Sequence, residues 1–146
     1  MTDAGEAAEL AALFDAARRV QAHAHAPYSR FAVGAALRTA SGAIFAGCNV
    51  ENAAYPEGIC AETGAIAAMI AAGERIITHV VVIGDGVTPL TPCGACRQRL
   101  AEFGTLETRI YCSTSEGIGA PHLLGDLLPH AFSAHRLAEG RLRSQA

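Results

Sequence analysis

The first periodic stretch of the chain carries apolar residues at helical spacing. Between Glu6 and His25, apolar side chains recur every three or four residues, while Arg18 and Arg19 fall outside that stripe. This period predicts an amphipathic helix over Glu6–His25 that packs its apolar side on a core. Pro27 ends the pattern, because a proline inside the helix would remove a hydrogen bond.

Four later stretches favour β-strands. Phe31–Thr39 and Ala43–Val50 flank the turn pair Ser41-Gly42, which predicts an antiparallel hairpin. Thr78–Gly84 contains four consecutive β-branched residues, a run typical of a strand that is buried on both faces. Arg109–Ser113 is the fourth candidate.

Helical stretches lie between the later strands. Cys60–Ala72 is rich in Ala, Ile and Met, lacks a polar face and precedes Gly73, so we expect a helix buried on several sides. Cys93–Phe103 is also predicted to be a helix, and Gly104 follows it as the C-terminal stop. The remaining tail is loop-like, apart from a short helix near Leu123–Leu128.

The order of these elements predicts an α/β fold, a mixed β-sheet layered with α-helices. The length of 146 residues suits a single domain, residues 1–146, with a core of its own. Hydrophobic residues make up 51% of the chain and charged residues 17%, below the roughly 25% of typical soluble domains. This composition excludes a disordered chain and favours an oligomer.

The net charge and the length of the apolar runs limit which partners and which cell compartment we expect. Eleven basic residues against fourteen acidic ones give a net charge of −3, which disfavours binding to nucleic acid. No apolar run approaches the ~18 residues of a membrane span. The segment Met1–Glu6 lacks the basic residues of a signal peptide, so we expect a cytoplasmic protein. Disulfides are rare there, and the five cysteines are therefore expected to be thiols or metal ligands.

The candidate chemistry lies in three cysteines at predicted helix starts. Cys93 and Cys96 form a C-x-x-C pair, and Cys60-Ala61-Glu62 opens the preceding helix. Thiols three positions apart on a first helical turn project to one side. A helix N-terminus also favours the thiolate, the form that binds metal. We therefore expect these three cysteines to bind one Zn²⁺ ion.

Three protein ligands leave one tetrahedral position open, as in catalytic zinc sites. Zinc lowers the pKa of bound water, and Glu62 lies close enough in sequence to act on that water as general acid and base. The combined pattern, C-x-E followed by P-C-x-x-C, is that of zinc-dependent nucleobase deaminases.

Two other readings of the cysteines remain open. A lone C-x-x-C pair can be a redox dithiol. Cys48 and Cys112 are better interpreted as core thiols, but either could close the zinc site as a fourth ligand and leave a binding module without catalysis. The six histidines show no ligand spacing.

The chain resembles the small, homotetrameric cytidine deaminases from about Pro27 to Phe132. The resemblance rests on five blocks in the order of that family: 27–37, 47–53, 60–62, 92–98 and 127–132. It implies zinc-dependent hydrolysis of cytidine, and of 2′-deoxycytidine, to the uridines and ammonia in pyrimidine salvage. A related deaminase acting on another aminopyrimidine nucleoside is the alternative.

The resemblance assigns the reacting groups residue by residue. Cys60, Cys93 and Cys96 would hold one zinc ion per chain. Glu62 would take a proton from the zinc-bound water, protonate ring nitrogen N3 and later pass a proton to the departing ammonia.

The resemblance also implies a set of substrate contacts. Phe31 would pack against the base, and the backbone at Ala61 would contact the base edge. Asn49 and Glu51 would bind the ribose hydroxyls. The sequence supports that pair, because positions two apart on a strand share a face, and an amide with a carboxylate suits two hydroxyls.

Two further assignments concern neighbouring subunits and the metal. Tyr55 and Phe132 would reach into the pocket of another subunit of the homotetramer. Thr63 stands where many family members have arginine, and a zinc ion with three thiolates carries a formal charge of −1. We hypothesise that Arg97 or another cation offsets that charge, in addition to the helix N-termini.

Overall fold

The computed structural model describes residues 3–143, so Met1, Thr2 and the last three residues of the expected 1–146 domain lie outside it. In chain order the elements are α1 (Asp3–Gln21), β1 (Val33–Thr39), β2 (Ile44–Cys48), the 3₁₀ helix η1 (Tyr55–Glu57), α2 (Ala61–Ala71), β3 (Ile77–Gly84), α3 (Gly94–Phe103), β4 (Arg109–Thr114), β5 (Pro121–Leu123), α4 (Leu124–Leu127) and α5 (Ala134–Arg143). None of the helices within 3–143 has the length and apolarity needed to cross a bilayer.

The strands form one mixed sheet in the order β2-β1-β3-β4-β5. β1 pairs antiparallel with β2 and with β3, while β3 and β4 run parallel and are connected through α3. The predicted hairpin is confirmed, and Gly42 in its turn has a φ of 90°, a conformation that glycine adopts without steric cost. The mixed α/β sheet expected from the element order is therefore present.

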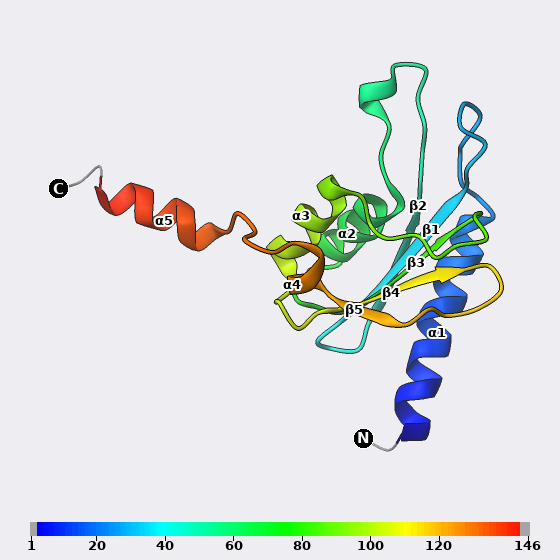
Figure 1. The fold of residues 1–146 in the computed structure, drawn as a ribbon, viewed down its shortest axis with the longest axis horizontal. Coiled ribbons are helices and arrows are strands. Elements are labelled where there is room, and N and C mark those ends of the chain that lie inside the picture. The colour runs from blue at the N-terminus through cyan, green and yellow to red at the C-terminus, as the bar shows by residue number, and fades with distance from the viewer. Residues whose placement is uncertain (1–2, 144–146) are drawn as a thin grey trace.

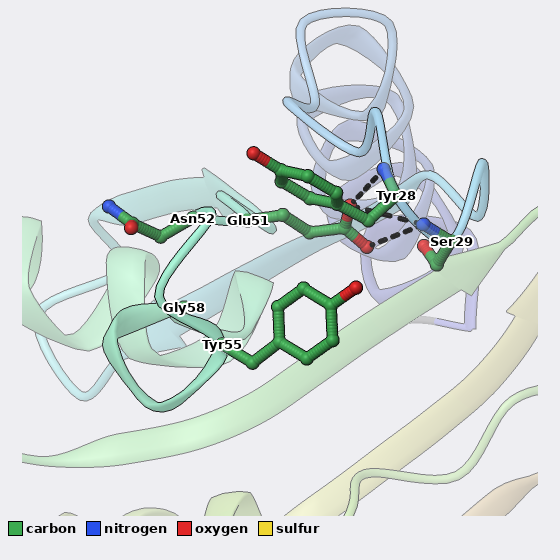
Figure 2. A pocket seen from close by; sticks show the side chains of 6 residues that line it. All are labelled: Tyr28, Ser29, Glu51, Asn52, Tyr55 and Gly58. Atoms are coloured by element: carbon green, nitrogen blue, oxygen red, sulfur yellow. Dashed lines mark hydrogen bonds between the residues drawn. The ribbon is translucent and has the colours of Figure 1, made fainter.

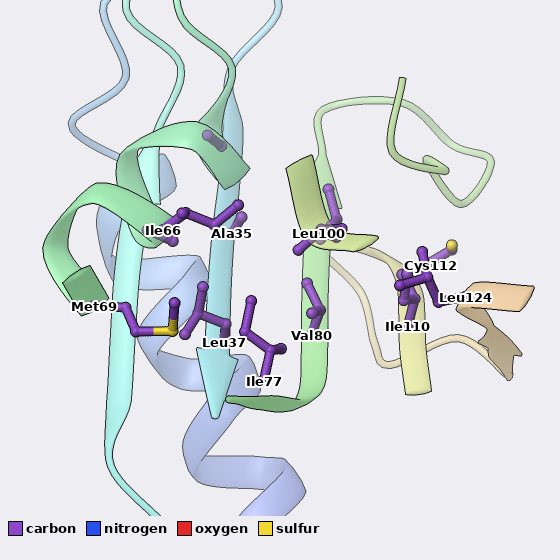
Figure 3. Packing of buried hydrophobic residues seen from close by; sticks show 13 residues of the cluster. Ala35, Leu37, Ile66, Met69, Ile77, Val80, Leu100, Ile110, Cys112 and Leu124 are labelled. Carbon is purple, nitrogen blue, oxygen red and sulfur yellow. The ribbon is translucent and has the colours of Figure 1, made fainter. Parts of the chain in front are cut away.

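Helices cover both faces of the sheet (Figure 1). On one face, α1 packs on the sheet through a cluster that includes Leu13, Val81 and Ile83. On the other face, α2, α3 and α4 enclose a larger cluster (Figure 3) that includes Val80 and Val82. The four consecutive β-branched residues of β3 alternate between the two cores, which confirms the strand buried on both faces.

Several boundaries differ from those predicted. α1 ends at Gln21 rather than His25, and the buried Gln21 side chain bonds to residues far along the chain. β5 was not anticipated, because three residues that begin with Pro121 show no alternation. α5 was not anticipated either. It extends away from the sheet in Figure 1, and its residues 134–138 are exposed.

One end of the sheet collects the segments that carry the candidate site. The register pairs Gly34 with Cys48 and Val33 with Gly84, so β1 begins where β2 and β3 end. The loop from β3 then leads to the start of α3. The predicted metal-ligand, base and sugar residues therefore converge at this end, where α/β sheets commonly bind ligands.

α2 lies unusually close to β2 at Gly47. A Cβ atom on Gly47 would lie 2.4 Å from the Ala65 nitrogen and 2.6 Å from the Ala61 oxygen. Both are backbone atoms, so a larger residue would force the whole helix to move. The first turn of α2 carries Glu62, and the candidate site therefore depends on this close packing.

Gly47→Ala is expected to lower the free energy of unfolding by about 1–3 kcal/mol, the usual cost of overpacking a core. Denaturant unfolding would measure the change. Gly117→Ala is the matched control, because a Cβ there would meet no atom within 4 Å. Equal unfolding midpoints for the two variants would contradict the close contact.

Candidate metal centre and active site

Two helix starts bring the three predicted ligands together. Cys60 is the N-cap of α2 and Cys93 the N-cap of α3, both with extended backbone immediately before the helix. Cys96 follows in the first turn of α3 and is buried. The Sγ atoms of Cys60 and Cys93 lie 3.8 Å apart, and the three sulfurs all lie within 4.8 Å of one another.

The geometry and the donor set fit a zinc ion. Zn–S bonds of about 2.3 Å at tetrahedral angles place neighbouring sulfurs roughly 3.8 Å apart. Cys60, Cys93 and Cys96 form the only such cluster of His, Cys, Asp or Glu donors among residues 3–143. Cys48 and Cys112 are free thiols outside it, so the described residues favour three protein ligands rather than a closed four-ligand site.

The pKa values of the Cys60 and Cys96 thiols are shifted in opposite directions. Hydrogen bonding with Cys96, and then with Cys93, lowers the pKa of Cys60 to about 6. The same contact with Cys60, together with burial, raises the pKa of Cys96. A divalent cation removes this conflict by binding all three as thiolates, so metal binding here is expected to release protons.

Glu62 is aimed at the sulfur cluster from the first turn of α2. Its side chain is only 4% exposed, and its Oε2 accepts a hydrogen bond from the Cys96 thiol at 3.3 Å. Burial raises the pKa of the Glu62 carboxyl, because a desolvated carboxylate is disfavoured. The structure therefore places the Glu62 carboxyl beside the predicted metal ligands.

A cavity of about 390 Å³ opens above the cluster and brings most of the predicted site together. Its lining comprises Phe31, Val33, Asn49, Val50, Glu51, Tyr55, Gly58, Ile59, Cys60, Ala61, Glu62, Leu90, Thr91 and Cys93. The predicted site did not include the lining residues Val33, Val50, Gly58, Ile59, Leu90 and Thr91. Of these, Thr91 directly precedes the P-C-x-x-C motif, and that adjacency was an available signal. Phe132 is not part of this lining.

Asn49 and Glu51 bind the loop opposite them in addition to facing the cavity. The Asn49 amide accepts from the Val33 N–H at 2.8 Å and donates to the Phe31 carbonyl at 2.9 Å. The Glu51 carboxylate accepts from the N–H groups of Tyr28 and Ser29, as Figure 2 shows. Hydrogen bonding from Ser29, and then from these amides, lowers the pKa of Glu51 and favours the carboxylate.

Tyr55 and Phe132 are large aromatic side chains on the surface. Tyr55 is 75% exposed on η1 and meets the Tyr28 ring edge-on, with ring centroids 5.6 Å apart. It also borders a second cavity of about 390 Å³, which lies beside Glu51 (Figure 2). Phe132 is 59% exposed, and its carbonyl accepts a hydrogen bond from Gln98 at 2.8 Å.

Arg97, the cation hypothesised to offset the thiolate charge, has neutral hydrogen-bond partners in the structure. Its guanidinium donates to the carbonyls of Pro92 and Leu127 and to the Thr91 hydroxyl. The charge of Arg99 instead adds to the hydrogen bonds that lower the pKa of Cys60. At Thr63, the hydroxyl oxygen is buried and, within residues 3–143, lacks a hydrogen-bond partner.

Arg97 joins the ligand loop to the C-terminal segment, and Arg97→Gln is expected to cost about 1.5–3 kcal/mol of unfolding free energy, the value of hydrogen bonds to charged groups. Thermal or denaturant unfolding of the zinc-loaded protein would measure it. Arg18→Gln, at an exposed position of α1, is the control. Equal stability of the two variants would show that the three bonds of Arg97 contribute little.

Comparison with known proteins places these features in a family. A model of the cytidine and deoxycytidylate deaminase zinc-binding region matches residues 8–113. A cytidine deaminase from Halalkalibacterium halodurans is 40% identical over 111 residues, which cover 76% of this chain and 84% of that protein. The cytidine deaminase of Mycobacterium tuberculosis is 42% identical over 126 residues, covering 86% of this chain and 90% of that protein.

Solved structures agree with the sequence relatives. The crystal structure of cytidine deaminase from Burkholderia pseudomallei superimposes with a TM-score of 0.79 at 42% identity, over 90% of this chain and 100% of that chain. The match of residues 8–113 spans both metal-ligand motifs, and the similarity extends over most of the fold. This chain therefore belongs to the cytidine and deoxycytidylate deaminase family.

Proposed function

We propose that the protein is a zinc-dependent cytidine deaminase, which hydrolyses cytidine and 2′-deoxycytidine to the corresponding uridines and ammonia. The observation that carries the proposal is the buried Glu62 carboxyl beside a three-sulfur cluster on the wall of an open cavity. The volume of about 390 Å³ falls within the roughly 300–1,000 Å³ of small-molecule sites.

Cys60, Cys93 and Cys96 would hold the zinc ion. Bound zinc supplies a Lewis acid that makes a water molecule nucleophilic near neutral pH. The Glu62 carboxylate accepts a proton from the attacking water and delivers it to ring nitrogen N3, while a C–O bond forms at C4. Glu62 then moves the second water proton to the amino group, the C4–N bond breaks and ammonia leaves.

The remaining residues of the cavity orient the nucleoside. Phe31 supplies an apolar surface for the pyrimidine ring, and the backbone at Ala61 faces its polar edge. Asn49 and Glu51 keep unused hydrogen-bonding capacity beyond their contacts with the loop, so they can also bind the sugar hydroxyls.

The lining of the cavity favours a nucleoside over a nucleotide. Neither this cavity nor the one beside it is lined by an arginine, and Glu51 borders both. A carboxylate there would repel a 5′-phosphate, which proteins usually bind with arginine or lysine. We therefore expect cytidine to be a much better substrate than cytidine monophosphate.

We further propose that the chain acts as a homotetramer in the cytoplasm, in pyrimidine salvage, and that subunits share their sites. The exposure of Tyr55 and Phe132 supports this, because large aromatic side chains on a surface are typical of interfaces. The net charge of −3 supports a small-molecule substrate rather than nucleic acid.

The direct test is ammonia release from cytidine by purified protein, with the zinc content measured on the same sample. Turnover with about one zinc ion per chain would support the proposal. Bound zinc without turnover would reject cytidine as the substrate, and a panel of other aminopyrimidine nucleosides would then test the alternative. Cytidine monophosphate in the same assay tests the preference for nucleosides.

A further inference from the structure

The loop that carries Phe31 is held by side chains from distant parts of the chain. Each of the six consecutive backbone N–H groups in 28–33 has a hydrogen-bond acceptor. In chain order the acceptors are Glu51, Glu51, the Ala26 carbonyl, the Ser29 hydroxyl, Asp85 and Asn49. Such complete pairing is unusual for an irregular surface loop and indicates a fixed conformation.

The loop does not adopt this conformation through local preference alone. Arg30 has a φ of 56°, in the left-handed region that is sterically unfavourable for a residue with a Cβ. Backbone strain of this kind persists when the surroundings hold the segment in place, and it is common at binding sites. The hydrogen bonds from residues outside the loop therefore have to offset the conformational cost at Arg30.

Gln21 and Asp85 hold both backbone groups of Ala32. Asp85 Oδ2 accepts from the Ala32 N–H at 2.9 Å, and the Gln21 side-chain amide donates to the Ala32 carbonyl at 3.1 Å. The same amide donates to Asp85 Oδ1 at 3.0 Å. Gln21 is 7% exposed and Asp85 lies at the surface, so these contacts form a closed triangle, buried at its Gln21 corner, around the residue that follows Phe31.

The segment that carries Asp85 also supports the Phe31 ring. A Cβ atom on Gly84 would lie 3.1 Å from the ring atoms Cε1 and Cζ, and one on Gly86 would lie 3.9 Å from Cε2. The ring therefore packs on Gly84 and Gly86 while Asp85, between them, binds the adjacent backbone. Asn49 secures the Phe31 carbonyl from the other side at 2.9 Å.

We propose that Gln21 and Asp85 are positioning residues of the deaminase site, which act through Ala32 to fix the Phe31 ring where the pyrimidine base binds. Asn49 shares this role, in addition to its contact with the sugar. The inference rests on the proposed function, in which Phe31 packs on the base. Gln21 and Asp85 line neither of the two cavities at the site, so they have no direct contact with substrate there.

The kinetic test uses the zinc-loaded protein with cytidine. Asp85→Ala removes the acceptor, and Gln21→Met removes the donor while keeping a side chain of similar shape. Each is expected to raise KM more than it lowers kcat, with kcat/KM falling about tenfold, as small misplacements of binding groups do. Combined with Phe31→Ala, neither should lower kcat/KM further, because residues that act through one group are not additive.

Thr108→Val is the matched control for general destabilisation. Thr108 is buried, and its hydroxyl bonds to the Ile77 carbonyl at 3.2 Å and to the Thr105 N–H at 2.9 Å. These contacts lie at the opposite end of β3 from Gly84. The control should lose stability to a similar degree without the change in KM.

A second measurement follows the Phe31 ring independently of activity. The five phenylalanines can be labelled with 4-fluorophenylalanine, and Phe31→Leu identifies the Phe31 fluorine resonance. Asp85→Ala and Gln21→Met are expected to shift or broaden that resonance, and Thr108→Val is expected to leave it unchanged.

The outcomes distinguish a failure of the proposed function from a failure of the positioning role of Gln21 and Asp85. If the wild-type protein does not deaminate cytidine, the proposed function fails and the fluorine spectra alone decide the positioning role. If Phe31→Ala lowers kcat/KM but the loss from Asp85→Ala multiplies with it, the inference is overturned. An unchanged Phe31 resonance in both variants overturns it as well.

Discussion

Glu62→Gln is expected to lower kcat for cytidine by roughly 10⁴-fold, the upper end of what a general acid and base contributes. Glutamine keeps the shape of the buried side chain, but its amide cannot take a proton from water or deliver one to the base. Glu62 is not one of the three clustered sulfur ligands, so the variant should still bind about one zinc ion per chain. Loss of turnover with the metal retained is the specific signature of this role.

Kinetics and zinc content have to be measured on the same samples of Glu62→Gln. Glu102→Gln, at an exposed position of α3, is the matched control and should keep the wild-type kcat. Turnover of Glu62→Gln within tenfold of wild type would remove Glu62 from the proton transfers. Loss of zinc from the variant would indicate instead that the carboxylate is a ligand.

The metal centre could be predicted because its determinants are local. The C-x-x-C spacing places Cys93 and Cys96 within one helical turn, and a cysteine directly before a helix lies at its N-terminus whatever the rest of the fold does. The convergence of the two helix starts needed tertiary structure, but the motif around Cys60 already indicated it.

The support of the substrate cavity could not be predicted in the same way. Asn49 and Glu51 both line the cavity, as expected, but they follow the end of β2, and Val50 between them lines the cavity too, so strand alternation does not explain their placement. Their bonds to the loop depend on the register of β1 with β2. Gln21 and Asp85 are 64 positions apart, and nothing in either local sequence indicates that their side chains meet.

Adjacency in sequence was a poor guide to electrostatics. Arg97 follows a metal ligand directly, yet the helix turns its guanidinium toward the carbonyls of Pro92 and Leu127. Arg99 lies farther along the chain, but its charge acts on both Cys60 and Glu62. The direction of a side chain on a helix depends on its angle around the axis, and a neighbouring position points about 100° away.

Cys96→Ser is expected to abolish both zinc binding and turnover. A serine hydroxyl has little tendency to ionise near neutral pH, and only two thiolates would remain to hold the ion. Zinc that binds the folded state stabilises it, by about 4 kcal/mol when the free ion is present at 1,000 times its dissociation constant. The variant should therefore also unfold at a lower temperature than the zinc-loaded wild type.

A chelator makes this prediction specific to the metal. Wild-type protein stripped of zinc and Cys96→Ser should melt at similar temperatures, because both lack the ion, and chelator should have no further effect on the variant. Cys48→Ser is the control, since Cys48 lies outside the sulfur cluster and should leave zinc content and turnover unchanged. If Cys96→Ser keeps a full complement of zinc, or if Cys48→Ser loses it, the three-sulfur site is wrong and the ligand set has to include other residues.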